Sequence, residues 1–120
     1  MIKSTGEPII RKILKQYHIN FKEQWRFKDC RHILPLPFDF AIFDKNDNLI
    51  LLIEFNGLQH YYQYENTYYD DLDETKRRDQ IKIDYCRQNH IELMVISYRE
   101  KRNLKNIILR KINELLVGDL

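Results

Sequence analysis

Two acidic residues, Asp39 and Glu54, lie within apolar stretches on either side of a short polar segment. Glu54 follows the apolar run 49–53, and Asp39 lies in the run 38–43. The segment between them, 45–48, is rich in Asn and Asp, which is typical of a β-hairpin turn. A turn centred in this segment makes the two acids direct cross-strand partners, so the sequence predicts two carboxylates facing each other.

Facing carboxylates suggest metal chemistry. Cross-strand partners have Cβ atoms roughly 5 Å apart, and like charges at that distance are destabilising unless a cation lies between them. Carboxylate and carbonyl oxygens are the ligands that Mg²⁺ prefers, so Asp39, Glu54 and the backbone carbonyl of Phe55 form a candidate site for Mg²⁺, with Mn²⁺ as a substitute. Such an ion could lower the pKa of a bound water and stabilise charge on a phosphate. The alternative is that one acid pairs with an arginine or faces solvent.

The elements that must position these acids follow from the hydrophobic pattern. Helical and alternating periodicities predict an α/β chain with a helix near 5–18, strands near 21–28, 38–44 and 49–55, a helix over 73–89, a strand over 91–98 and a helix over 104–116. The third strand is almost continuously apolar and should lie in the centre of the sheet. The last strand follows a helical crossover, so we expect it to be parallel to its neighbour in a mixed sheet.

Strand alternation also gives a prediction for the side chains around the first acid. Successive side chains of a strand point to opposite faces, so Asp39 should share a face with Ala41 and Phe43. On the partner strand, Glu54 should share a face with Leu52. Both acids would then protrude from otherwise apolar faces, at the end of the hairpin away from its turn.

Length and composition indicate one soluble globular domain over residues 1–120. Hydrophobic residues make up 43% of the chain and charged residues 32%. No apolar run is long enough to span a membrane, and the N-terminus has no signal-peptide pattern, so we expect no membrane partner. The two isolated cysteines, Cys30 and Cys86, are interpreted as buried, reduced thiols of a cytoplasmic protein rather than zinc ligands.

Charge is segregated along the chain. Residues 39–75 contain one lysine and nine acids, whereas the flanking segments 1–38 and 76–120 each carry a net charge of +5. This distribution is expected if the acidic middle segment binds a metal ion and the basic flanking segments attract a polyanion such as DNA. The alternative is that surface charges cluster here by chance.

Four segments together resemble the PD-(D/E)XK nuclease superfamily. They are Gly6-Glu7, Pro37-Phe38-Asp39-Phe40, Glu54-Phe55-Asn56-Gly57-Leu58-Gln59-His60 and Arg78-Asp79-x-x-Lys82 with Tyr85-Cys86. The nearer likeness is to very-short-patch-repair-type nicking enzymes and related phage homing endonucleases. The resemblance implies a single restriction-endonuclease-like domain with the order α-β-β-β-α-β-α and a mixed central sheet flanked by helices. It also implies a Mg²⁺-dependent DNA endonuclease in the cytoplasm of a bacterial or phage-infected host cell.

Carried over by position, the resemblance makes Asp39 and Glu54 the metal-binding acids. Glu7 would be the helix acid that reaches the same site, although an acid in a first helical turn is also favoured by the helix dipole alone. The superfamily places a lysine two residues after the second acid, and this chain has Asn56 there. A neutral amide cannot supply the charge of that lysine.

Two residues are candidates to replace the missing lysine. His60 could act as a general base or phosphate contact, or could simply stack among neighbouring tyrosines. Lys82 is the second candidate, since some relatives carry the lysine on the following helix. It shares a helix face with Arg78, and a solvated face is the alternative for both. Gln59 could orient the attacking water.

Nucleic-acid contacts are expected from the basic residues of the second half of the chain, namely Arg78, Lys82, Arg99, Lys101 and Arg102, although these could merely form a soluble surface. The leading hypothesis is an endonuclease that hydrolyses DNA with a metal-activated water. The alternative is a catalytically inactive module of nuclease fold that binds nucleic acid or protein. No separate DNA-reading domain is visible, so target recognition would come from a homodimer or from another chain.

Overall fold

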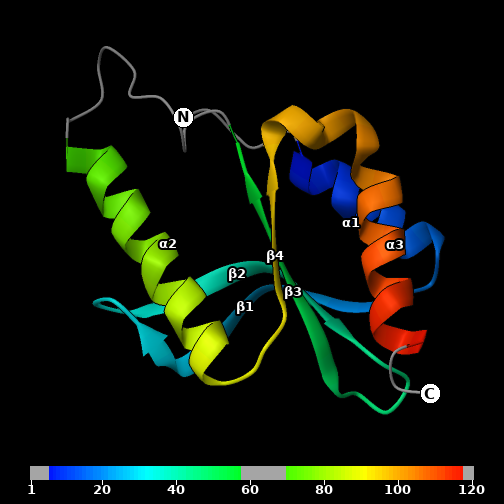
Figure 1. Ribbon diagram of the computed structural model, residues 1–120, viewed down its shortest axis with the longest axis horizontal. Helices are drawn as coiled ribbons and strands as arrows, with labels where there is room; N and C mark the ends of the chain where they lie inside the picture. The colour runs from blue at the N-terminus through cyan, green and yellow to red at the C-terminus, as the bar shows by residue number, and fades with distance from the viewer. Residues whose placement is uncertain (1–5, 58–69, 118–120) are drawn as a thin grey trace.

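The computed structural model describes residues 6–57 and 70–117, which form a compact α/β domain with a mixed four-stranded sheet (Figure 1). The elements in chain order are α1 (Gly6–Gln16), β1 (Asn20–Arg31), β2 (Pro35–Phe43), β3 (Leu49–Asn56), α2 (Asp70–Gln88), β4 (Leu93–Ser97), the 3₁₀ helix η2 (Tyr98–Asn103) and α3 (Leu104–Val117). The predicted order of helices and strands is confirmed, with η2 as an addition. Within the described ranges, no helix is long and apolar enough to cross a membrane.

The sheet has the strand order β1-β2-β3-β4. β1 and β3 both run antiparallel to β2, whereas β4 runs parallel to β3, so the prediction of a mixed sheet is confirmed. β3 lies between β2 and β4, and residues 51–55 are buried. Its uninterrupted apolar sequence therefore reflects a strand covered on both faces.

Two apolar cores lie on opposite sides of the sheet. Figure 1 shows α1 and α3 on one side of the strands and α2 on the other. The core under α1 and α3 includes Ile10, Phe40, Ile53 and Ile108, and the core under α2 includes Phe38, Ala41, Leu52 and the two buried cysteines. Both cysteines are free thiols, as predicted. The alternation of β3 between the cores fixes the face on which Glu54 emerges, two residues after Leu52.

β1 and β2 depart from regular geometry at the level of the first acid. Phe38 and Ala41 both pack in the α2 core although they are three residues apart, while Phe40 packs in the opposite core. Gln24, which the flanking register pairs place opposite Asp39, has a left-handed backbone with φ of 52°. The prediction that strict alternation continues through Asp39 is therefore wrong, because both strands switch faces there.

The boundaries of the first strands also differ from expectation. The predicted strand near 21–28 is longer, since β1 extends to Arg31, and β2 begins at Pro35 rather than near residue 38. Pro35 and Pro37 precede the part of β2 that pairs with β3, and among the described strands they pair with β1 alone. A proline is tolerated in such an edge segment, because its missing N–H need not donate to a second strand. The result is a long ribbon that projects beside α2 (Figure 1).

Candidate functional site

Asp39 and Glu54 meet where β2 and β3 separate. The register pairs Phe40 with Ile53, so the two acids are the next pair along the strands, as predicted. The backbone N–H of Asp39 donates to Oε1 of Glu54 at 2.8 Å, and the backbone N–H of Phe55 donates to Oδ2 of Asp39 at 2.7 Å. Each carboxylate thus binds the opposite strand, and side chains continue the connection between the strands.

The polar segment forms the predicted turn at the other end of this hairpin, where the backbone N–H of Asp44 donates to the carbonyl of Asn48. The carboxylate of Asp44 accepts hydrogen bonds from the backbone N–H groups of Asn46 and Asn48, and Asp47 adopts a left-handed backbone with φ of 62°. Asn and Asp tolerate that conformation and form such turns readily. The strand register shifts by one residue between Ile42 and Phe43, so the pairing of the acids depends on this irregularity as well as on the turn.

Glu54 is a buried acid. It is 6% exposed, and among the described residues it is the one charged or polar residue that is buried. Burial, and then the charge of Asp39, raises the pKa of Glu54 to about 7. Lys82 and the N–H of Asp39 act in the opposite direction but are outweighed. Near neutral pH this carboxyl is poised between its protonated and ionised forms, and an added positive charge would favour ionisation.

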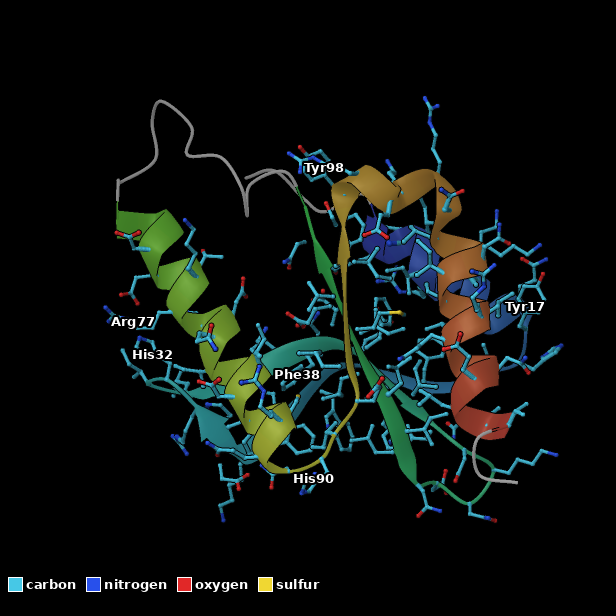
Figure 2. All side chains as sticks on the ribbon, viewed as in Figure 1. Tyr17, His32, Phe38, Arg77, His90 and Tyr98 are labelled. Carbon is cyan, nitrogen blue, oxygen red and sulfur yellow. The ribbon has the colours of Figure 1, made fainter. Side chains whose placement is uncertain are left out.

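Lys82 reaches the site from α2. Its Nζ donates to Oε2 of Glu54 at 2.7 Å, and the two side chains are only 11% and 8% exposed. The same ammonium lies 5.3 Å from the centre of the Phe38 ring, which Figure 2 labels beneath α2. The i, i+4 neighbour Arg78 is exposed instead. Of the two basic residues predicted on this helix face, only Lys82 contacts the acids.

Glu7 is brought to the acids by the glycine that precedes it. A Cβ atom on Gly6 would lie 2.4 Å from Cζ of the Phe55 ring, so only glycine lets the start of α1 lie this close to β3. Burial, and then the charge and side-chain hydrogen bond of Asp39, raise the pKa of Glu7, while Arg11 opposes the shift. The helix acid predicted from the family resemblance therefore contacts Asp39.

A small cavity opens beside Glu54 on the α2 side. Its volume is about 90 Å³, and its lining residues are Glu54, Asn56, Asp79, Lys82, Ile83, Leu93 and Val95. Asn56 and Lys82 thus face the same space from β3 and α2. Asp79 was not predicted as a site residue, although its i, i+3 spacing from Lys82 is a signal that could have pointed to it.

The basic residues of η2 follow the end of β4, next to the end of β3 that carries Glu54. Asn56 pairs with Ser97, and η2 begins at the next residue, where Ser97 and Glu100 form a capping box. Arg99, Lys101 and Arg102 belong to η2, whose start is marked by Tyr98 in Figure 2. The predicted phosphate contacts therefore lie past the end of β3, the strand that carries Glu54.

The acids contact one another in pairs and do not surround a common point as metal ligands do. Glu7 contacts Asp39, and Asp39 contacts Glu54, but within residues 6–57 and 73–117 no group of three or more His, Cys, Asp or Glu residues is arranged to hold a metal ion. Gln59 and His60, predicted to act in catalysis, lie outside the described residues. The described part of the site is thus a hydrogen-bonded acid cluster with Lys82 as its cation.

Comparison of the chain with protein-family models, with curated proteins and with solved structures gave no match. Functional assignment therefore depends on the geometry and electrostatics of this cluster.

Proposed function

We propose that the chain is a metal-dependent DNA endonuclease with a restriction-endonuclease-like fold. The observation that carries the proposal is the convergence of Glu7, Asp39, Glu54 and Lys82 from α1, β2, β3 and α2 on one point at the open end of a hairpin. Three acids and a lysine that approach from four elements form an unfavourable arrangement for a purely structural role, since buried like charges destabilise a fold. They suit a reaction in which charge develops on a phosphate.

The donor set fits a divalent cation. Asp39 and Glu54 would hold Mg²⁺, with Mn²⁺ as a substitute, and the carbonyl of Phe55 is the third oxygen that the strand offers. The raised pKa of Glu54 supports this assignment, because burial, and then the charge of Asp39, disfavour the ionised carboxylate, and a bound cation would favour it. When bound, the ion would supply the Lewis acid that lowers the pKa of water and stabilises the phosphate.

The residues of the chain have separate tasks in this proposal. Lys82 has three N–H donors and uses one on Glu54, so the others can bind an oxygen of the phosphate and hold it beside the acids. Glu7 orients Asp39 through their side-chain contact. Arg99, Lys101 and Arg102 would bind phosphates farther along the DNA backbone.

The second candidate function is that of a catalytically inactive module with a nuclease fold, which binds DNA or protein without cleaving DNA. Asn56 favours it, because the position where the superfamily carries its lysine holds a neutral amide. The contact between Lys82 and Glu54 also favours it, because the lysine occupies an oxygen that a metal would use. A binding module predicts that loss of either acid leaves DNA binding unchanged.

Plasmid nicking tests the proposal. Purified protein is incubated with supercoiled plasmid in Mg²⁺, Mn²⁺ or EDTA, beside Asp39→Ala, His60→Ala and the matched control Glu114→Ala, which removes an exposed acid of α3. We expect nicking that requires metal, is lost with Asp39 and is retained in the control. Reduced nicking by His60→Ala would give that residue a role in the reaction.

Mn²⁺ binding by calorimetry separates the two candidate functions. Mn²⁺ binding that disappears with Asp39→Ala, together with metal-dependent nicking, supports the endonuclease. DNA binding with neither cleavage nor Mn²⁺ binding supports the binding module and overturns the nuclease proposal.

A further inference from the structure

The tip of the β1–β2 ribbon presents two adjacent apolar side chains to solvent. Ile33 is 79% exposed and Leu34 is 70% exposed, the two largest values among large apolar side chains of the described residues. The backbone N–H of His32 donates to the carbonyl of Leu34 at 3.3 Å, which closes a tight turn before Pro35. Single exposed apolar residues are common on protein surfaces, but an apolar pair at the end of a projecting ribbon suggests a contact surface.

Hydrogen bonds to α2 hold this tip in place. His32 Nε2 lies 3.2 Å from Oε2 of Glu74, and the hydroxyl of Tyr85 donates to Asp29 at 2.7 Å. Figure 2 shows His32 and Arg77 at the same edge of the molecule, and Arg77 also pairs with Glu74. Because α2 also carries Lys82, one helix supports both the tip and the acid cluster. The apolar pair is therefore pre-organised relative to the proposed site.

Three cations in the second half of β1 precede the apolar pair along the ribbon. Lys28 and Arg31 are exposed within the last residues of β1, Arg26 precedes them, and Asp29, the acid among them, is engaged by Tyr85. The guanidinium of Arg31 lies 3.4 Å from the carbonyl of Ile33, directly at the turn. An apolar pair at the end of a ribbon that carries exposed cations complements a partner that has stacked apolar rings inside and negative charges outside, which describes duplex DNA.

The spacing along β2 agrees with this partner. Leu34 precedes Asp39 by five residues, so an extended strand separates them by at most about 17 Å. That length corresponds to roughly five steps of 3.4 Å along a DNA strand. A two-stranded ribbon also matches the width of the major groove of DNA. A duplex could therefore contact the tip and the acid cluster at the same time.

We propose that Ile33 and Leu34 form a wedge that inserts between base pairs of duplex DNA and kinks it about five base pairs from the phosphate held at the acid cluster. The distance to that phosphate depends on the proposed nuclease function, whereas the wedge itself does not. Insertion unstacks a base step, so flexible pyrimidine–purine steps such as TpA are the favoured positions. Arg26, Lys28 and Arg31 bind the phosphates on either side.

Fluorescence of duplex DNA tests the wedge without requiring cleavage. The full chain is mixed in EDTA with 30-base-pair duplexes that carry TpA steps containing 2-aminopurine, and with the same duplexes labelled at both ends for energy transfer. The tip variant is Ile33→Ser with Leu34→Ser. The matched control is Leu116→Ser with Val117→Ser, which removes two exposed apolar side chains of α3.

We expect wild-type protein and the control to raise 2-aminopurine fluorescence and end-to-end energy transfer. The tip variant should lose both signals and bind about tenfold more weakly, because the unstacked step no longer has an apolar partner. Signals equal to wild type in the tip variant, or no binding of the duplexes by wild type, would overturn the wedge.

Two further results separate the wedge from the nuclease site and from self-association. Kinking in EDTA with neither cleavage nor Mn²⁺ binding would support the wedge and reject the nuclease, while cleavage without any 2-aminopurine change would do the reverse. Sedimentation equilibrium covers self-association. A dimer that the tip variant abolishes, with DNA kinking unaffected, would assign the apolar pair to a second copy of the chain and overturn the proposal.

Discussion

The two ends of the β2–β3 hairpin each hold a carboxylate that accepts backbone N–H groups, with opposite electrostatic results. At the turn, hydrogen bonds from Asn48 and Asn46 lower the pKa of the half-buried Asp44. At the open end, Glu54 also accepts a backbone N–H, yet burial and Asp39 raise its pKa to about 7. A carboxylate that accepts backbone N–H groups can thus have a lowered or a raised pKa. Burial and a nearby second acid decide the direction of the shift.

This difference assigns separate tasks to the two ends. Asp44 is ionised at every physiological pH and serves to set the turn. Glu54 and Asp39 keep a like-charge contact that a purely structural hairpin could have avoided by an apolar pair. The turn end stabilises the hairpin, and the open end carries the proposed chemistry.

The largest expected effect comes from neutralising one acid at each end. Asp39→Asn keeps an oxygen for the N–H of Phe55 but removes the charge, so we expect nicking to fall at least about a thousandfold with little change in the melting temperature. Asp44→Asn, the matched change at the turn, should lower the melting temperature and leave nicking per folded molecule intact. Equal losses of activity in both variants would contradict the division of tasks.

A lysine exchange sharpens the role of the open end. Lys82→Asn should reduce nicking about a hundredfold, since it removes the cation next to Glu54. Because Asn56 and Lys82 line the same cavity, Asn56→Lys in the Lys82→Asn background should restore a substantial part of the activity. Lys12→Ala, at a position of α1 outside that cavity, is the control. A double variant no better than Lys82→Asn would show that the position of the ammonium on α2 is essential.

The metal-free protein should show an unusual pH dependence from Glu54. The pKa of this carboxyl is about 7 in the folded state and near 4.5 in the unfolded state, so the folded state binds its proton more tightly. The resulting stabilisation is complete below pH 4.5 and is lost as the pH rises through 7, by up to roughly 3 kcal/mol. Urea unfolding in EDTA from pH 4.5 to 8 measures it, and Glu54→Gln should remove this part of the slope.

The smallest expected effect tests the approach of α1. Gly6→Ala places a methyl group against the Phe55 ring, so the start of α1 must shift, at a cost of about 1–3 kcal/mol in unfolding free energy. Glu7 should move away from Asp39, with a modest loss of nicking. Pro8→Ala, two residues farther along the same helix turn, serves as the control. Unchanged stability in Gly6→Ala would contradict the close contact.

Several features of the fold could be predicted from local patterns. The Asn- and Asp-rich segment predicted the hairpin and the facing of Asp39 and Glu54, but it gave no sign of the register shift between Ile42 and Phe43 on which that pairing also depends. The apolar run of β3 predicted a strand inside the sheet, and β3 lies between β2 and β4. These inferences need only the periodicity of one element or of two adjacent ones.

The remaining features depend on contacts between distant elements. Whether Lys82 contacts Glu54 or solvent depends on how α2 lies across the sheet, which the spacing to Arg78 does not reveal. The face switch at Gln24 has no visible signal, because the apolar residues on either side of it keep the same alternation in the sequence. The start of β2 at Pro35 was not predicted, because prolines such as Pro35 and Pro37 are rare in strands other than edge strands.

The bonds between each acid and the opposite strand make two backbone amides into spectroscopic probes. The amide protons of Asp39 and Phe55 point at the carboxylates of Glu54 and Asp39, respectively. Their chemical shifts should therefore follow the charge on those carboxylates as protons or cations are added. In an ¹⁵N-labelled sample, two cross-peaks would report the state of each acid separately, without any substitution at the site.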